Sequence, residues 1–380
     1  MSPSSSKPQP LTVLAVVRSE LACLVGLATL VVFLLWGKPL LGDLSSTAWY
    51  LLVLCWLFAV MLWLAFAVVR HADCLAVKLG EPYGTLILTL SVISIEVIMI
   101  SAVMLTGGDN RTLARDTTFA VLMIVLNGIV GLTLLLGGLK HREQEYNLAG
   151  ANAYISLLIP FAGLSLVLPR FAESTDDYSP SPAFAVFLTI ASVVLYGAFL
   201  ALQTMRHRVF FVQPGEGGDE HGHGGLVVRS AAYHVVFLLL CMVPIVLLSK
   251  SMAKVIDHGI TTVGAPAALG GFLVAFLVLA PEGLGAVRAA LANQLQRTMN
   301  ICLGSALATV GLTVPAVLII GMITGKTVEL GLGDVDLILI ILTLAVSVVN
   351  FSGRRTNVMQ GAVHLLLFAA YIVSIFDNNV

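Results

Sequence analysis

Charged side chains are scarce in this sequence, because Asp, Glu, Lys and Arg make up only 11% of its 380 residues. A soluble domain typically carries about 25%. The net charge is −1, so the clustered basic face that nucleic acid requires is missing, and we expect no nucleic-acid partner. The five cysteines have neither metal-ligand nor disulfide-framework spacing. The first apolar segment lacks a small-residue cleavage site, and we expect no removable signal peptide.

Apolar runs, by contrast, fill most of the chain, which is 58% hydrophobic. A membrane-spanning helix needs about 20 mainly apolar residues. On that rule the sequence predicts an all-α polytopic membrane protein in a lipid bilayer, with about eleven transmembrane helices. Their expected bounds are 17–37, 47–69, 82–107, 116–139, 148–169, 183–205, 230–250, 264–292, 298–321, 334–351 and 359–376. The loops between them are too short to form a soluble domain.

The distribution of Lys and Arg indicates how the chain is oriented. Most of the 20 basic residues fall in the N-terminal tail and in the loops that eleven spans would place on the same side. Basic loops favour the cytoplasmic side of a membrane. We therefore expect a cytoplasmic N-terminus and, after eleven crossings, an external C-terminus.

Two apolar segments are alike in how they start and in carrying one acidic residue. One opens with Gly-Glu-Pro at 80–82 and carries Glu96, and the other opens with Gly-Ala-Pro at 264–266 and carries Glu282. The proline and the glutamate are 14 residues apart in the first segment and 16 in the second, or about 21 and 24 Å of helix. Each carboxylate should therefore lie in the interior of its span.

The segment after each glutamate segment contains the same four residues, Val-Gly-Leu-Thr, at 130–133 and 310–313. The first glutamate segment should start inside and the second outside, so we predict two inverted five-helix repeats preceded by one extra helix. The expected divisions are a polar N-terminal tail (1–16), the extra first helix (17–37), the first repeat (47–205), a Gly-, His- and acid-rich cytoplasmic linker (206–229) and the second repeat (230–376).

Glu96 and Glu282 are the candidate cation- and proton-binding residues. A charge at mid-bilayer costs at least about 2.5–3.5 kcal/mol, so intramembrane carboxylates usually face a cavity or a partner. A protonated structural glutamate is the alternative for either one alone, but equivalent places in two repeats favour function. Pro281 has no N–H, so the helix is expected to break there and free the carbonyl of Leu277 for a cation. Such oxygen ligands suit Ca²⁺, Na⁺ or protons rather than soft metals.

Other polar residues in the apolar segments are weaker candidates. Those that could support the site are Ser94, Asn127, Pro281, Asn300, Ser305 and Thr309. Ser and Thr often bond only to their own helix, and that alternative stays open. His234 and His364 could relay protons, although a satisfied structural histidine is the favoured interpretation for each.

Four motifs carry a resemblance to a known family. They are GEPYGTLILTLSVISIEV (80–97), APEGLGAVRAAL (280–291), NQLQRTMN (293–300) and GLTVP (311–315). On these motifs the sequence resembles the calcium/cation antiporter superfamily, in particular its calcium/proton exchanger branch and, within it, the bacterial ChaA type. The resemblance implies a multi-pass protein of the cell inner (plasma) membrane with alternating access. It also implies one glutamate per half, Glu96 and Glu282, that ligates the transported cation.

The implied function is secondary active transport, in which a cytoplasmic cation is exchanged for protons, without enzymatic activity or a resident cofactor. The wider family often has Gly-Asn shortly before the site glutamate, where this chain has Val92-Ile93 and Val278-Leu279. Without those amide ligands, Ca²⁺, Na⁺ and K⁺ all stay open as the transported ion. The alternative is a cation channel with the glutamates as selectivity residues. A homo-oligomer is also left open.

Overall fold

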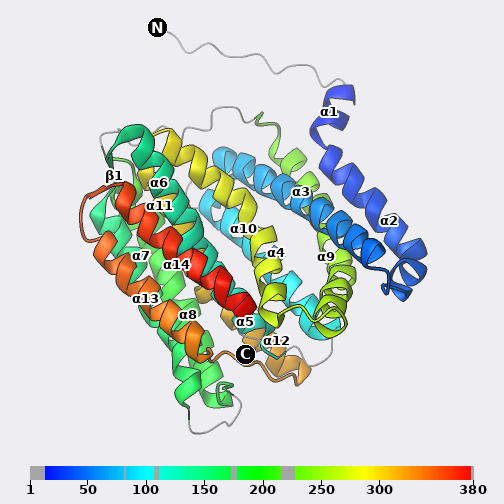
Figure 1. The fold of residues 1–380 in the computed structure, drawn as a ribbon. Helices are drawn as coiled ribbons and strands as arrows, with labels where there is room; N and C mark the ends of the chain where they lie inside the picture. The colour runs from blue at the N-terminus through cyan, green and yellow to red at the C-terminus, as the bar shows by residue number, and fades with distance from the viewer. Residues whose placement is uncertain (1–12, 81–82, 107–110, 173–177, 215–226, 378–380) are drawn as a thin grey trace.

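The computed structural model describes residues 13–80, 83–106, 111–172, 178–214 and 227–377, and in them the chain is almost entirely helical (Figure 1). The elements up to the middle of the chain are α1 (Val13–Ser19), α2 (Leu21–Gly42), α3 (Thr47–Leu79), α4 (Tyr83–Thr106), α5 (Leu113–Leu122), η1 (Met123–Ile129), α6 (Val130–His141), β1 (Gln144–Glu145), α7 (Leu148–Ala162), η2 (Gly163–Val167), η3 (Leu168–Phe171), α8 (Pro182–Ala201), η4 (Leu202–Arg206) and η5 (Arg208–Phe211). The remaining elements are α9 (Ala231–Thr261), α10 (Ala267–Leu291), α11 (Leu295–Ala308), η6 (Thr309–Thr313), α12 (Val314–Thr324), α13 (Asp334–Asn350), β2 (Arg355–Thr356) and α14 (Val358–Asp377).

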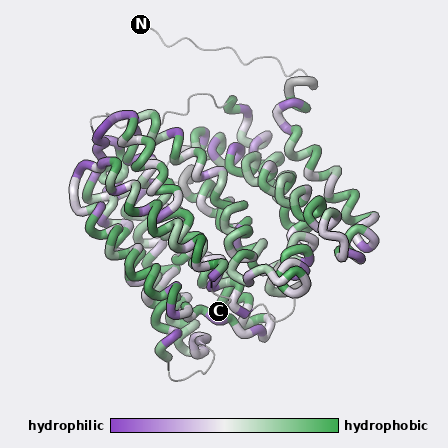
Figure 2. Tube along the Cα trace, in the orientation of Figure 1, coloured by the Kyte–Doolittle hydropathy of each residue, from purple (hydrophilic) through white to green (hydrophobic). Residues whose placement is uncertain are grey.

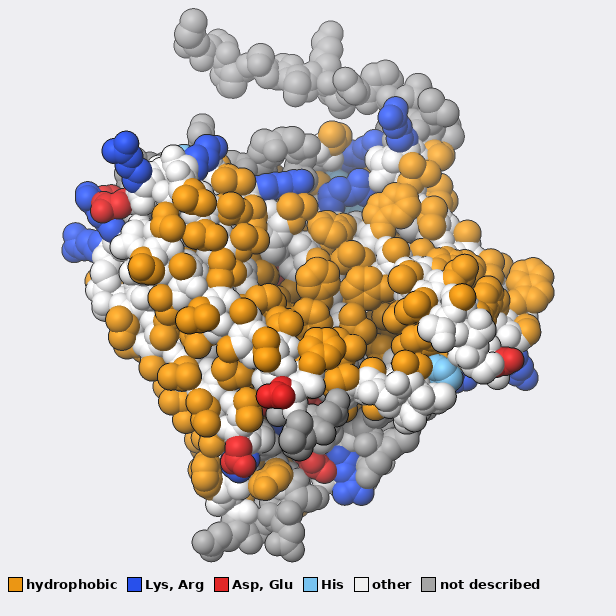
Figure 3. Space-filling model, in the orientation of Figure 1, with side chains coloured by type: hydrophobic (Ala, Val, Ile, Leu, Met, Phe, Trp, Pro, Cys, Tyr) orange, Lys and Arg blue, Asp and Glu red, His pale blue; other side chains and the backbone are white. Residues whose placement is uncertain are grey.

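The bundle has the surface of a membrane protein. Within the described residues, nine helices or joined helices are long and apolar enough to cross a bilayer. The other two predicted spans are shorter: α4 has an apolar stretch over Leu86–Ala102, and α13 has 17 residues. Apolar residues run along the helices (Figure 2), and their side chains cover the flank of the molecule, with Lys and Arg gathered at its upper edge (Figure 3). The predicted all-α polytopic class is confirmed, with nine to eleven spans.

Several helices extend past the bounds expected from hydropathy. The third helix, α3, continues through Arg70 to Leu79 and ends at Gly80, whose φ of 67° a helix cannot continue. Similarly, α9 continues past Lys250 to Thr261. A span expected from hydropathy ends at a charged residue, whereas the backbone hydrogen bonds of the helix continue past it. The expected polar tail, 1–16, also needs correction, because helix α1 already begins at Val13.

Hydrogen bonds between chain segments show which helix ends lie together at each of the two opposite faces of the bundle. Bonds on the first face are Lys78–Arg229, Lys140–Leu291 and Gln144–Asn293, and bonds on the opposite face are Glu329–Arg111, Leu330–Tyr178 and Leu332–Leu166. Helix α4 follows the end of α3 on the first face, whereas α10 ends on that face at Leu291. The two glutamate helices, α4 and α10, therefore run in opposite directions through the bundle.

Glycines allow a close helix contact between α6 and α14. A Cβ added at Gly361 would lie 2.5 Å from the backbone nitrogen of Leu135 and 2.7 Å from the carbonyl oxygen of Gly131. Real Cβ atoms do not approach backbone atoms this closely, so only glycine fits at this position. Such small-residue contacts take the place of the hydrophobic effect in holding helices together within lipid.

We expect the Gly361→Ala variant to lose about 1–3 kcal/mol of unfolding free energy, because the added methyl group must push the two backbones apart. The measurement is denaturant unfolding of the purified protein in detergent micelles. Gly197→Ala on α8 is the matched control, since a Cβ there meets nothing within 4 Å. Equal stability of the two variants would contradict the close contact.

Candidate functional site

Glu96 lies in the middle of α4 and points into the bundle. Its side chain is 2% exposed, and its Oε2 accepts a hydrogen bond of 3.0 Å from the Thr309 hydroxyl in η6. The hydroxyl of Thr313, on the same segment, also faces this carboxylate. The second oxygen, Oε1, is buried and has no hydrogen-bond partner. A buried acceptor without a donor is costly, so this oxygen is suited to a proton or a cation.

Glu282 lies in α10 and repeats this pattern. Glu282 as a whole is half-buried, and Ser305 of α11 is its hydrogen-bonding neighbour. Its Oε2 atom is buried and has no hydrogen-bond partner. The flanking Pro281 and Gly283 are both buried. A Cβ at Gly283 would lie 3.0 Å from Cδ1 of Ile129, so the glycine lets α10 pack closely against η1. Each glutamate thus has at least one hydroxyl neighbour and one unsatisfied oxygen.

The two carboxylates lie in the same part of the bundle. The charge of Glu282 acts on Glu96, and α4 packs against α10, α11 and η6 in this region. Among the described residues, neither glutamate forms an ion pair with Lys, Arg or His. In the same part of the chain, no group of three or more His, Cys, Asp or Glu side chains could hold a resident metal.

The helix around Glu282 does not break, contrary to the prediction from Pro281. Helix α10 runs without interruption from Ala267 to Leu291 with this proline inside it. The bundle packed around α10 keeps the backbone helical, although the carbonyl of Leu277 still lacks the N–H that proline cannot supply. Helix α4 is also continuous around Glu96. The carboxylates are thus presented from intact helices.

Wider π-helical turns take the place of the expected helix breaks. Segment η1 lies directly before the first Val-Gly-Leu-Thr motif (130–133), and η6 contains the second (310–313). The η6 turn carries Thr309, the hydrogen-bond donor to Glu96. Such π-turns insert one extra residue into a helix and often occur at functional sites. The sequence offers no simple signal for them, apart from the repeated motif itself.

Asn127 is placed in a different polar contact. From η1 its amide nitrogen donates to the hydroxyl of Thr343 on α13 at 2.8 Å, and its amide oxygen accepts from Nδ1 of His364 on α14 at 3.1 Å. All three side chains are buried. Asn127 therefore ties η1 to α13 and α14, and its contacts do not include either glutamate.

Two more of the candidate side chains bond elsewhere. Ser94 donates to the carbonyl of Leu90 on its own helix at 2.6 Å, which is the alternative left open for serines. The amide of Asn300 donates to the carbonyl of Phe211 at 2.7 Å and so holds the η5 segment. Most of the glycine- and histidine-rich part of the expected linker, 215–226, lies outside the described residues. Of the supporting candidates, Ser305 and Thr309 lie beside the carboxylates, and Pro281 adjoins Glu282 in the chain.

Residues that the sequence did not single out also face Glu282. Asp73 on α3 and Tyr196 on α8 both interact electrostatically with it. Tyr196 is buried, and its ring packs 3.0 Å from where a Cβ of Gly311 would lie. Asp73 was missed because the expected span ended at residue 69, before the last turns of α3. A longer expected span would have included Asp73, and an acid inside an apolar helix would then have marked it as a candidate.

In the described part of the chain, membrane-crossing helices surround two glutamates that have no basic partner. This arrangement is typical of a membrane transporter. The chain belongs to the sodium/calcium exchanger protein family, which matches residues 49–205 and 233–376. It is a transporter and not an enzyme. The two matched segments begin two and three residues after the predicted repeats, 47–205 and 230–376, and end at the same residues.

Relatives and solved structures agree with this family. The chain is 42% identical over 375 residues to the sodium-potassium/proton antiporter ChaA of Escherichia coli (strain K12), covering 94% of this chain and 97% of that protein. It is 22% identical over 259 residues to a Ca²⁺/H⁺ antiporter of Aphanothece halophytica, covering 64% and 68%. The fold resembles native YfkE (TM-score 0.71, 18% identity, 94% and 99% covered) and the H⁺/Ca²⁺ exchanger CAX (0.65, 14%, 94% and 88%).

We expect Thr309→Val to lower the unfolding free energy by about 1–3 kcal/mol at neutral pH, because it leaves both oxygens of Glu96 without a donor. The loss should shrink when Glu96 is also replaced by Gln, and the double-mutant cycle measures this coupling in detergent. Thr324→Val is the control, since that exposed hydroxyl bonds only within its own helix. A coupling near zero would contradict the hydrogen bond.

Proposed function

We propose that this protein is a cation/proton antiporter in which Glu96 and Glu282 form the shared binding site. The observation that carries the proposal is the symmetry of the pair. Each of two oppositely running helices presents one carboxylate with a buried, unsatisfied oxygen. The relatives named as cation/proton antiporters support the same reading.

The inverted repeats belong to this proposal. We infer that residues 47–205 and 230–376 form two inverted five-helix halves, and that α2 is the extra helix. In support, the family matches the chain twice, and α4 and α10 run in opposite directions. Alternating access then follows from rocking one half against the other around the glutamate pair.

Charge balance couples the two substrates. Two bare carboxylates inside an apolar bundle are costly, and protons or a cation each remove that cost. The loaded site can therefore change its exposure, whereas the empty site is held in place. One Ca²⁺ would replace two protons, whereas one Na⁺ or K⁺ would replace one proton and leave the second carboxyl neutral. Every loaded state then keeps the same total charge in the site.

The ligand set favours a monovalent cation. Ca²⁺ takes six to eight oxygens, whereas the site offers two carboxylates and the hydroxyls of Thr309 and Ser305, without the amide ligands seen in the wider family. We propose that Na⁺ and K⁺ are the main substrates and that Ca²⁺ is carried less well. Export is from the cytoplasm across the inner membrane, with the basic first face inside and the C-terminus outside.

We expect Glu96→Gln and Glu282→Gln each to abolish exchange, because glutamine is neutral and cannot trade a proton for a cation. The measurement is cation-triggered pH change inside proteoliposomes that contain a trapped dye. Glu143→Gln is the matched control, because Glu143 is exposed and pairs with Arg355 at the first face. Retained proton-coupled flux in both site variants would rule out the shared site.

In the same vesicles we expect Na⁺ and K⁺ to produce a faster pH change than Ca²⁺ at equal concentration. A larger Ca²⁺ response would reject the monovalent preference while leaving antiport intact. Cation flux measured by isotope without any pH change would instead indicate a channel with the glutamates as its selectivity residues.

A further inference from the structure

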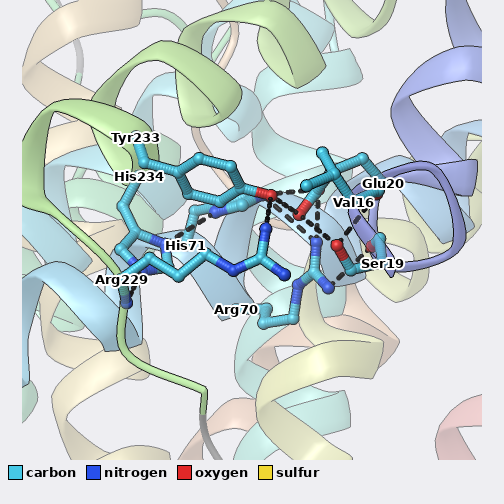
Figure 4. A network of polar contacts seen from close by, with 8 residues as sticks. All are labelled: Val16, Ser19, Glu20, Arg70, His71, Arg229, Tyr233 and His234. Atoms are coloured by element: carbon cyan, nitrogen blue, oxygen red, sulfur yellow. Dashed lines mark hydrogen bonds and ion pairs between the residues drawn. The ribbon is translucent and has the colours of Figure 1, made fainter. Parts of the chain in front are cut away.

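A second buried polar cluster lies at the first face, away from the glutamate pair. Its centre is formed by Glu20 at the start of α2, His71 on α3 and His234 on α9, which are 3%, 1% and 3% exposed (Figure 4). Buried charged and imidazole groups are normally satisfied by partners. Here they are satisfied mainly by one another, across three helices that are far apart in the sequence.

The three side chains form a continuous chain of contacts. Nε2 of His71 lies 3.0 Å from Oε2 of Glu20, and Nδ1 of His71 lies 3.0 Å from Nδ1 of His234. At the far end, the backbone N–H of Arg229 donates to Nε2 of His234 at 2.9 Å. The chain thus begins at a carboxylate and ends at a backbone N–H.

These two ends assign the protons on both rings. The Glu20 carboxylate only accepts, so Nε2 of His71 carries a hydrogen that points at it, and Nδ1 of the same ring accepts. Nη2 of Arg70 also lies 3.2 Å from Nε2, but a lone pair on Nε2 would face the carboxylate and set N–H against N–H at the middle bond. The N–H of Arg229 only donates, so Nε2 of His234 accepts and its Nδ1 carries the hydrogen. The assignments agree at the middle bond, where His234 donates to His71. The opposite tautomers would set N–H against N–H at Arg229 and a lone pair against Glu20.

A further proton has no free position in this arrangement. Both imidazoles are neutral, and the remaining lone pair of each already accepts a hydrogen bond. Protonating His71 would set two N–H groups against each other at the middle bond. Protonating His234 would do the same at Arg229. Charging either ring therefore breaks the chain of contacts.

The charged neighbours also disfavour an additional positive charge in the cluster. Arg70 bonds Glu20 at 2.6 Å, and Arg229 bonds the hydroxyl of Tyr233, which donates to Glu20 at 2.6 Å. Two guanidinium groups thus surround one carboxylate, and an imidazolium would add a third positive charge. Titratable groups that also face the cluster are the thiols of Cys23 on α2, Cys74 on α3 and Cys241 on α9. On the other side of α3, Asp73 faces Glu282 and Arg297.

Glu20 itself stays ionised throughout the physiological range. Burial alone would raise the pKa of Glu20, but hydrogen bonds from His71 and Tyr233 and the charge of Arg70 outweigh it and lower this pKa to about 2. Once separated from its partners, this carboxyl would regain a pKa near 4.5. Above about pH 5.5, the separation of the cluster therefore takes up no proton at Glu20.

We propose that His71 and His234 form a pH-sensitive latch that joins α2 to α3 and α9 at the first face and opens when that side becomes acidic. The latch links the helix outside the two family-matched segments to the first helix of each of them. The freed His234 imidazole has an ordinary pKa near 6.5, whereas in the latch both of its nitrogens are held in hydrogen bonds. The stability that the latch contributes is therefore present above about pH 6.5 and is lost as the pH falls below it.

The effect on transport rests on the proposed antiport, whereas the latch itself does not. Helix α3 packs against α4 and α10, and α9 packs against α4, so both first helices adjoin the glutamate helices. Helices α3 and α9 come from different halves and also pack against each other. Exchange then requires this pair to move together past the glutamate helices α4 and α10. An open latch uncouples the pair, so acidification of the first face slows exchange. Proton import would then restrain itself.

The test is amide hydrogen exchange of the full chain in nanodiscs at pH 7.5 and pH 5.5, with rates corrected for the intrinsic pH effect. Uptake of one proton by the freed His234 imidazole, of pKa about 6.5, raises the opening constant about tenfold between these values. We expect this acceleration in peptides from the start of α2 and the start of α9. It should disappear in the His71→Gln/His234→Gln variant, because glutamine can donate and accept but cannot titrate.

His258→Gln is the matched control, because His258 lies near the other end of α9, where its ring packs against Tyr50. It should keep the tenfold response. If the double variant does not fold, His234→Gln alone should reduce the response. An equal acceleration in the wild type and the double variant, or none in the wild type, overturns the latch.

The transport arm uses proteoliposomes with the pH of the first face stepped from 7.5 to 5.5 and the other side held constant. We expect the double variant to slow less than the wild type and the His258→Gln control. Equal slowing in all three, with hydrogen exchange still pH-dependent, would overturn regulation by the latch. Loss of all exchange in the wild type would instead count against the antiport proposal.

Discussion

The burial of two carboxylates without a cationic partner is the constraint on which the site depends. In the described part of the chain, Glu96 and Glu282 have hydroxyl neighbours but form no ion pair, and one oxygen of each is unsatisfied. An arginine beside them would neutralise their charge permanently. The carboxylates would then have no need to bind a proton or a cation. A pair left short of partners must take a proton or a cation from solution, and the surrounding fold has to tolerate that.

The same chain treats a third buried acid in the opposite way. Glu20 receives bonds from Arg70, His71 and Tyr233, and its charge is fully matched. A matched acid holds helices together and does not exchange its partners at neutral pH. Glu20 and the glutamate pair therefore differ in whether basic neighbours compensate the buried carboxylate.

Much of the fold could be read from the sequence, because hydropathy reports directly on contact with lipid. The glutamate pair could also be found, since acids inside apolar runs are rare and these two share their surroundings. The contacts of Asn127 and the His71–His234 pair could not be read, because they join segments that are distant along the chain. The break expected at Pro281 was wrong because packing around α10 keeps the helix intact, and proline chemistry alone does not report on packing.

The π-turn η6 shows how an intact helix can still deliver a hydroxyl to Glu96. An extra residue in a turn rotates the following side chains relative to an α-helix, and in η6 that turn starts at Thr309, which donates to Glu96. Gly311 in the same turn leaves room for the ring of Tyr196, which faces Glu282. One irregular turn thus reaches both carboxylates. A broken helix would expose carbonyls as fixed ligands, whereas a π-turn with hydroxyls can accept from or donate to the site as its load changes between proton and cation.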